Sequence, residues 1–183
     1  MPPSEEGDAR AYVGLGGNLG DRLATLRWAV RALQELPATR LVATSPIYET
    51  RPVGPSTEPF LNAAVELRTR LQPEGLLGTL LAIETLQGRK RRDKWEARTL
   101  DLDLLLYLRP TPTGWETVRA RADKLTLPHP RIVERDFVLV PLRDLVGGEA
   151  LLDGQTPEEW LARLDEGERT ILRRVTDADG LLG

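Results

Sequence analysis

The chain has 183 residues, no cysteine, one histidine and a formal net charge of −3. This length suits one domain with a sizeable core, so we expect residues 1–183 to form a single domain, with a flexible leader at 1–10 and a C-terminal extension at 150–183. The lack of cysteine excludes disulfides and thiolate metal sites, and an acidic chain has no general attraction for nucleic acid or an anionic membrane.

The first eight residues are polar and acidic, and no long apolar segment follows them. The sequence therefore predicts neither a signal peptide nor a membrane span, and we expect a cytoplasmic protein. Residues 11–15 are typical of a short buried strand, and the glycine-rich residues 16–20 of a turn. The spacing of these glycines differs from that of a dinucleotide-binding loop, and no clear βαβ unit follows, which disfavours that function.

Asp21 can cap a helix whose apolar residues recur at helical spacing as far as Pro37. Residues 40–49 alternate like a strand, and the proline-rich residues 50–59 predict a long loop. Loops of that length inside a compact domain are often functional.

The next predicted strand runs from residue 60 to about 71 and has two different faces. An aromatic ring and an amide, Phe60 and Asn62, share the face opposite the core. Such a pair suits a flat heterocycle, which stacks on a ring for about 1–3 kcal/mol; an edge aromatic that covers the sheet is the alternative. The expected core face carries Leu61, Ala63, Val65 and Leu67.

A second helix is predicted from Pro73 to Gly88, because proline suits the first helical turn and glycine the end. Five of the six residues at 89–94 are cationic, and Arg98 follows them. A charge run alone is typical of a solvated loop. Beside acidic residues it indicates phosphate binding, because arginine forks pair with phosphate oxygens.

The strand predicted from residue 98 to about 108 places Asp101 and Asp103 on one face. Two residues of strand rise separate them by roughly 6.6 Å. At an effective dielectric of about 20, two unit charges at that distance repel by roughly 2.5 kcal/mol, and a divalent cation would offset this repulsion. Oxygen ligands suit Mg²⁺, and a pair of such ions can hold transferring phosphates; an amphipathic strand with one solvated face is the alternative. The face expected to be core carries Leu100, Leu102, Leu104 and Leu106.

The order strand, helix, strand, strand, helix, strand is that of a ferredoxin-like βαββαβ core. We therefore expect an α+β fold with a mostly antiparallel sheet flanked by helices, plus an added hairpin and a C-terminal helix and strand. The hairpin is expected at 109–127, and a short helical stretch ends at Asp136. A capping box at Thr156 opens the last helix, and residues 170–175 form the last strand.

Five motifs stand in order along the chain: Y-V-G-L-G-G-N-L-G-D-R at 12–22, P-F-L-N-A-A-V at 59–65, R-T-L-D-L-D at 98–103, L-P-H-P at 127–130 and R-D-F at 135–137. Together they resemble the 6-hydroxymethyl-7,8-dihydropterin pyrophosphokinase family of folate biosynthesis, over about residues 11–145. The resemblance implies ATP-dependent transfer of pyrophosphate to the hydroxymethyl group of the pterin, which gives the pterin diphosphate and AMP.

The resemblance also implies roles for individual residues, with ATP as co-substrate and two Mg²⁺ ions held by Asp101 and Asp103. The implied catalytic residues are Arg89, Arg92, Arg98, Asp101 and Asp103. The implied pterin-binding residues are Thr50, Val53, Phe60, Asn62 and Phe137. The implied nucleotide-binding residues are Glu84, Arg91, Trp95, Arg98, Lys124, Thr126, His129 and Arg135.

The chain departs from the family pattern at Leu81, Lys124 and Pro130, which concern adenosine contacts. Two rival functions are a nucleotidyl transferase with a palm-like core and a ferredoxin-like module that binds a small regulatory ligand. The acidic charge disfavours the first, and the density of arginines around two aspartates disfavours the second. We expect a monomer with small-molecule substrates, no nucleic acid and no membrane partner.

Overall fold

The computed structural model describes residues 7–53, 56–88, 99–175 and 181–182. Its strands are β1 (Ala9–Gly17), β2 (Thr39–Thr44), β3 (Ile47–Thr50), β4 (Phe60–Thr69), β5 (Asp101–Thr111), β6 (Gly114–Thr117), β7 (Ala120–Ala122), β8 (Leu125–Leu127) and β9 (Ile171–Val175). Its α-helices are α1 (Arg22–Gln34), α2 (Pro73–Leu86), α3 (Asp136–Val146) and α4 (Pro157–Leu161), and 3-10 turns stand at Ile132–Glu134 and Glu166–Glu168. Within these ranges no helix is long and apolar enough to cross a membrane.

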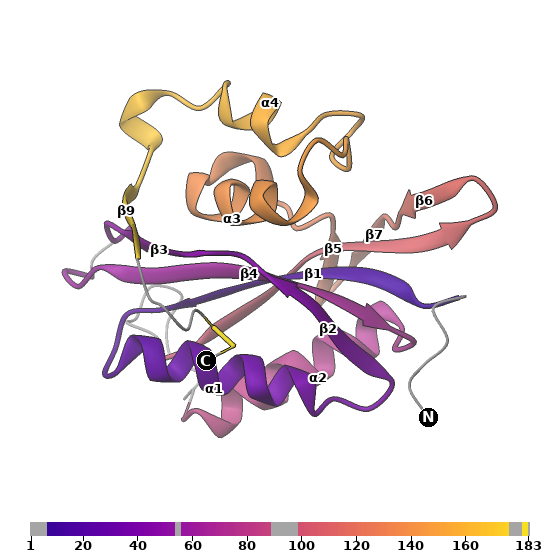
Figure 1. Ribbon diagram of the computed structural model, residues 1–183, viewed down its shortest axis with the longest axis horizontal. Helices are drawn as coiled ribbons and strands as arrows, with labels where there is room; N and C mark the ends of the chain where they lie inside the picture. Colours follow the sequence, from indigo (N-terminus) through magenta and orange to yellow (C-terminus); the bar gives the residue numbers. More distant parts are fainter. Residues whose placement is uncertain (1–6, 54–55, 89–98, 176–180, 183) are drawn as a thin grey trace.

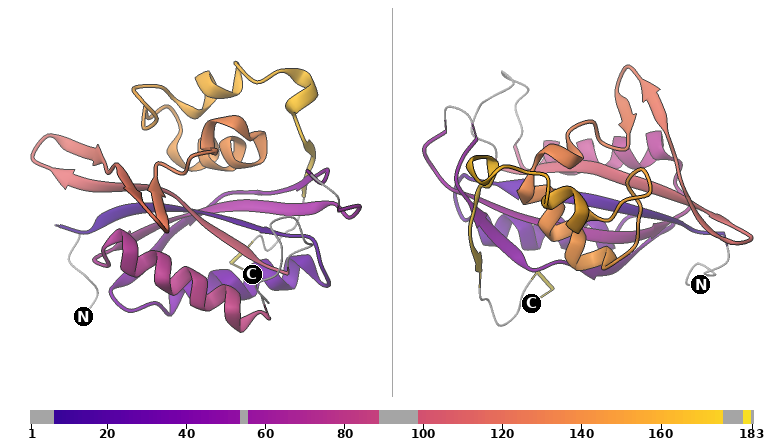
Figure 2. Two further views of the ribbon diagram at one scale, coloured as in Figure 1. Left: turned by 180° about the vertical axis from the view of Figure 1, so that it is seen from behind. Right: turned by 90° about the horizontal axis from the view of Figure 1, so that it is seen from above.

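One sheet organises the molecule, in the order β6-β5-β1-β4-β3-β9, with β2 also paired to β4. All of its strand pairs are antiparallel. Helices α1 and α2 cover one face, and α3 and α4 lie on the other (Figure 1). Figure 2 shows the same layers from behind, and from above it shows α3 and α4 over the sheet. The predicted α+β fold, with its mostly antiparallel sheet flanked by helices, is confirmed.

The two helices on the first face form where the sequence predicts them. The side chain of Asp21 accepts a hydrogen bond from Ala24 N at 3.0 Å and so caps α1. Pro73 occupies the first turn of α2, where its missing N–H costs nothing. The buried residues of both helices recur at helical spacing and pack on the sheet: Leu26, Ala29, Val30, Leu33, Leu76, Leu80 and Ile83.

The sheet is buried on both faces, so there are two hydrophobic clusters. One lies under α1 and α2, and the other lies between the sheet and α3. Strand β4 therefore has no solvated side along most of its length, and Asn62 and Glu66 are each 7% exposed. Burial of these polar groups requires partners, which the structure supplies at both residues.

Several elements differ from the sequence prediction, and the hairpin expected at 109–127 is two hairpins, β5–β6 and β7–β8. The expected strand at 40–49 is two strands, because the backbone breaks at Ser45, whose hydroxyl accepts from Ala64 N at 2.9 Å. Strand β1 begins at Ala9, inside the leader expected at 1–10, and Arg10 is 6% exposed. The short helical stretch expected to end at Asp136 is the 3-10 turn Ile132–Glu134, whereas α3 is a separate helix that the sequence did not predict; it begins at Asp136 and continues through Pro141.

A β-bulge in β5 changes the faces of its leucines. Tyr12 pairs with Leu106 and Val13 with Leu104, so Leu105 is the extra residue. Leu102 and Leu104 belong to the α1–α2 cluster as expected, but Leu105 and Leu106 both belong to the α3 cluster. The prediction that Leu106 shares a face with Leu104 is therefore wrong.

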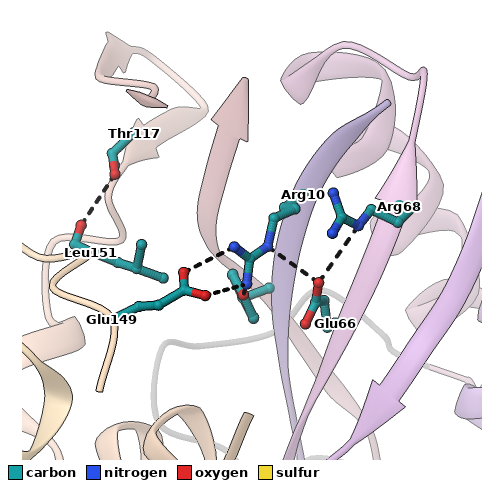
Figure 3. Close-up of polar contacts among 7 residues, drawn as sticks. Arg10, Glu66, Arg68, Thr117, Glu149 and Leu151 are labelled. Atoms are coloured by element: carbon teal, nitrogen blue, oxygen red, sulfur yellow. Dashed lines mark hydrogen bonds and ion pairs between the residues drawn. The ribbon is translucent and has the colours of Figure 1, made fainter. Parts of the chain in front are cut away.

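A group of charges that is buried at Arg10 and Glu66 joins β1 to the turn after α3 (Figure 3). The Arg10 guanidinium contacts Glu66 at 3.2 Å and Glu149 at 2.9 Å, and Arg68 lies 3.7 Å from Glu66. We call Arg10, Glu66, Arg68 and Glu149 the Arg10 cluster. It lies among β1, β4 and the turn after α3, and so ties residue 149 to the sheet.

Candidate active site

Two rows of residues across the sheet form the floor of the site on its α3 face. In the first row Asn62 of β4, Gly16 of β1 and Asp101 of β5 stand side by side. In the second row the corresponding residues are Ala64, Gly14 and Asp103. Strand alternation thus places both aspartates on one face, as the sequence predicts.

The glycines of β1 keep this floor open. A Cβ atom at Gly16 would lie 2.9 Å from Asn62 Oδ1, and one at Gly14 would lie 3.4 Å from Leu105 Cδ1. Neither glycine was among the predicted site residues. Glycines at alternate positions inside a strand are the signal that could have identified them, because they mark close approach by a ligand or another chain segment.

A cavity of about 390 Å³, which we call the larger cavity, lies over this floor. Nine of the predicted site residues line it: Thr50, Val53, Phe60, Asn62, Asp101, Asp103, His129, Arg135 and Phe137. Two of its polar side chains orient each other, because buried Asn62 donates from Nδ2 to Thr50 Oγ1 at 2.8 Å. The prediction did not include Gly14, Gly16, Arg51, Ser56 and Arg131, which also line the cavity.

A smaller cavity, of about 320 Å³, lies between α2, β5 and the β7–β8 hairpin. Its walls include the predicted residues Glu84, Lys124 and Thr126 together with Leu77 and Leu81. Four residues line both cavities: Asp101, Asp103, His129 and Pro130. A ligand in each cavity would therefore meet the other beside the two aspartates.

Glu84 has a structural contact within the wall of the smaller cavity. Its side chain is buried, and Oε1 accepts a hydrogen bond from Leu102 N at 2.7 Å. Leu102 lies between Asp101 and Asp103, so Glu84 fixes the backbone that carries both carboxylates. This oxygen is engaged within the protein, whereas the sequence prediction gave Glu84 only a nucleotide contact.

His129 is held at the junction of the two cavities by its backbone and its ring. Its backbone N–H donates to Leu105 O at 2.9 Å, and Nδ1 accepts from Arg131 N at 3.3 Å. A neutral ring therefore carries its proton on Nε2. Burial, together with the nearby charges of Arg135 and Arg131, lowers the pKa of His129 against the opposing effect of Asp101.

The two aspartates fit a magnesium site that a ligand completes. Within residues 7–53, 56–88, 99–175 and 181–182 no group of three or more His, Cys, Asp or Glu side chains could hold a metal alone. Mg²⁺ in phosphate-transfer sites typically takes one or two carboxylates and completes its shell with water and phosphate oxygens. The predicted residues Arg89, Arg91, Arg92, Trp95 and Arg98 lie outside the described residues.

Known proteins match this chain over most of its length. The family model of 7,8-dihydro-6-hydroxymethylpterin-pyrophosphokinase (HPPK) matches residues 12–147. A protein of Methylorubrum extorquens named 2-amino-4-hydroxy-6-hydroxymethyldihydropteridine pyrophosphokinase is 43% identical over 157 residues, which are 85% of this chain and 94% of that protein. A protein of Pseudomonas aeruginosa with the same name is 43% identical over 154 residues, 84% of this chain and 90% of that protein.

Solved structures share the fold. A crystal structure of an HPPK-DHPS in complex with substrates has a TM-score of 0.63 at 14% identity. The match covers 85% of this chain and 43% of that one, so this chain spans less than half of that protein. By its match to the family model and its identity to both relatives, the chain belongs to the 7,8-dihydro-6-hydroxymethylpterin-pyrophosphokinase family.

Proposed function

We propose that this chain transfers pyrophosphate from ATP to the hydroxymethyl group of 6-hydroxymethyl-7,8-dihydropterin, as a step of folate biosynthesis. The pterin occupies the larger cavity and ATP the smaller one. The observation that carries this assignment is the pair of cavities that share Asp101, Asp103 and His129. Two substrates bound there would have their reacting ends beside the same carboxylates.

The lining of the larger cavity supports the pterin assignment. Phe60 and Phe137 supply aromatic surface, and aromatic stacking on a flat heterocycle is worth about 1–3 kcal/mol. Asn62 and Thr50 supply hydrogen-bonding groups whose orientation is fixed by their mutual contact. The ring of Phe137 is itself held in place, because the Arg135 guanidinium lies 5.4 Å from its centroid.

The carboxylates of Asp101 and Asp103 would hold Mg²⁺, and we propose two ions, as the resemblance implies. When bound there, Mg²⁺ would supply positive charge to offset the negative charge of the phosphates during transfer. The chain's own part is to orient the two substrates in line, so that the hydroxymethyl oxygen approaches the β-phosphorus and AMP leaves. No covalent intermediate with the protein is expected.

Cationic side chains support phosphate binding at the junction. Arg131 and Arg135 line the larger cavity, and their charges act on His129, while Lys124 lines the smaller cavity beside the uncharged Thr126. The roles of Arg89, Arg91, Arg92, Trp95 and Arg98 stay predictions, as do a monomeric state and a cytoplasmic location.

The test is to mix the protein with ATP, Mg²⁺ and the hydroxymethyl pterin, and to identify the nucleotide released. AMP formed in proportion to the pterin consumed supports the proposal. ADP would mean transfer of the γ-phosphate alone and would contradict it. Absence of turnover, beside an active control enzyme, would favour a ligand-binding module instead.

A further inference from the structure

The C-terminal extension contacts segments that form the walls of the larger cavity, although none of its described residues lines the cavity itself. Its residues 167–171 lie beyond the family match, which ends at residue 147. They reach two segments that line the cavity: the end of β3, with Thr50 and Arg51, and the start of α3, with Arg135 and Phe137. The segment itself contributes no residue to the cavity lining.

The contact with α3 is made through Asp136, which is 3% exposed and lies between Arg135 and Phe137. Its carboxylate accepts hydrogen bonds from Thr170 Oγ1 and Thr170 N, each at 2.6 Å, and from Ile171 N at 2.9 Å. Movement of this buried carboxylate away from Thr170 would break hydrogen bonds to a charged group, which are stronger than those between neutral groups, so these contacts hold it in place. The backbone of Arg135 and Phe137 is thereby fixed to the extension.

The contact with β3 is made by the same segment. The carbonyl oxygen of Thr170 accepts from Arg51 N at 2.9 Å, and the carbonyl oxygen of Gly167 accepts from Arg51 Nη2 at 2.6 Å. Strand β9 then pairs Ile171 with Thr50. Thr170 therefore joins both walls, since its N–H and hydroxyl bind the α3 side and its carbonyl binds the β3 side.

We infer that Asp136 and Thr170 are positioning residues that set the separation of the Phe137 wall from the Thr50–Arg51 wall, and so determine affinity for the pterin. This inference rests on the proposed function, because it takes the larger cavity as the pterin site. Neither residue lines the cavity. Their effect is geometric, and displacements of about 1 Å can cost up to a hundredfold in rate.

Two removals and two conservative changes test the inference. Thr170→Val removes the hydroxyl donor and keeps both backbone bonds, whereas Thr170→Ser keeps the donor. Asp136→Ala removes all three acceptor contacts, whereas Asp136→Asn can still accept from both N–H groups and donate to the Thr170 hydroxyl. For each variant the measurements are KM for the pterin, KM for ATP, kcat and Tm.

We expect Thr170→Val and Asp136→Ala to raise KM for the pterin by about threefold to thirtyfold while KM for ATP stays within about twofold. Thr170→Ser and Asp136→Asn should stay close to wild type. Thr156→Ala is the matched control, since it breaks the capping box of α4 in the same extension, away from the cavity. It should lower Tm without changing KM for the pterin.

Thr170→Val could leave KM for the pterin unchanged and lower Tm as Thr156→Ala does. The contact would then only stabilise the fold. That result would overturn the inference, while the proposed function would stand. If Asp136→Ala does not fold, the result for Thr170→Val alone tests the inference, because this variant keeps the backbone hydrogen bonds of residue 170 to Asp136 and Arg51. A wild-type protein that releases no AMP and does not bind the pterin by fluorescence titration would overturn the proposed function, and this inference with it.

Discussion

Asp103 is partly exposed and lines both cavities, so its carboxylate can be removed with little effect on packing. We expect Asp103→Asn to lower kcat for AMP formation by about 10²-fold or more, because the negative charge proposed to hold the metal ion is lost. Stability should change by no more than about 0.5 kcal/mol. Steady-state kinetics with a thermal melt measures both.

The control for this change is Asp123→Asn, since Asp123 is exposed and lines only the smaller cavity. It should retain most of the activity. Equal losses in the two variants would mean that general negative charge, and not the paired aspartates of β5, supports turnover.

His129 is the one histidine of the chain, so its ring protons can be followed by NMR without ambiguity. Burial and the charges of Arg135 and Arg131 lower the pKa of His129 below its ordinary value of 6.5. The unfolded chain therefore binds a proton more readily, and the stability that neutral His129 confers is lost as pH falls below about 6.5 towards the folded-state pKa.

The expected titration midpoint in the folded protein thus lies below 6.5. In His129→Gln the free energy of unfolding, measured by urea at a series of pH values, should depend less on pH between about 7 and 5. A midpoint at or above 6.5 would show that Asp101, and not burial, dominates the ring's environment.

At the scale of the elements, the openness of the site depends on glycine in β1. In Gly16→Ala the new Cβ would displace the Asn62 amide, which is buried and bonded to Thr50. We expect KM for the pterin to rise about tenfold and stability to fall by about 1 kcal/mol, because the core must adjust to an added methyl group.

Gly78→Ala is a matched control for this prediction. Gly78 lies on the exposed side of α2, and a Cβ there meets no atom within 4 Å. The change should leave KM unaltered and stabilise the protein by about 0.5–1 kcal/mol, as alanine does inside helices. An equal rise of KM in both variants would contradict the role given to Gly16.

The elements with a regular period were predictable, and the irregular ones were not. Helical spacing identified α1 and α2, and strand alternation placed Asp101 and Asp103 together. A run of leucines looks the same with or without an extra residue, so the bulge at Leu105 gave no local signal. Pro141 inside α3 argued against a helix there, although packing on the sheet overrides that preference.

The site itself was predicted largely through the family resemblance. Nine of the predicted residues line the larger cavity, yet the residues alone favoured only a cation near phosphates and a flat heterocycle. What the sequence could not give was the register between strands, which aligns Gly14 and Gly16 with the aspartates. Contacts between residues far apart in the chain, such as Asp136 with Thr170, have no local pattern.

At the scale of the molecule, the Arg10 cluster links the first strand to the turn after α3, far along the chain. Arg10→Ala would leave Glu66 as a buried charge without its closest partner, and removal of one member of a buried pair costs about 3–5 kcal/mol. Glu149 is about half exposed, so Glu149→Gln should cost less than about 1 kcal/mol. Urea unfolding of both variants measures the difference.

Similar losses in Arg10→Ala and Glu149→Gln would contradict this reading of the cluster. The comparison distinguishes the effect of the buried charge of Glu66 from that of the half-exposed charge of Glu149. Arg68→Ala is a further control, because Arg68 lies farther from Glu66 than Arg10 does.

The pairing of β9 with β3 has a consequence for solubility. Without β9, the buried residues of β3 would stand at an open sheet edge, and open edges recruit strands from other molecules into aggregates. β9 covers that edge, and its exposed Arg174 places a positive charge on the new one, while Arg173 pairs with Glu49 at 2.7 Å. Charged side chains on an edge disfavour pairing with a second copy, so we expect a chain without its last strand to aggregate more readily during storage at high concentration.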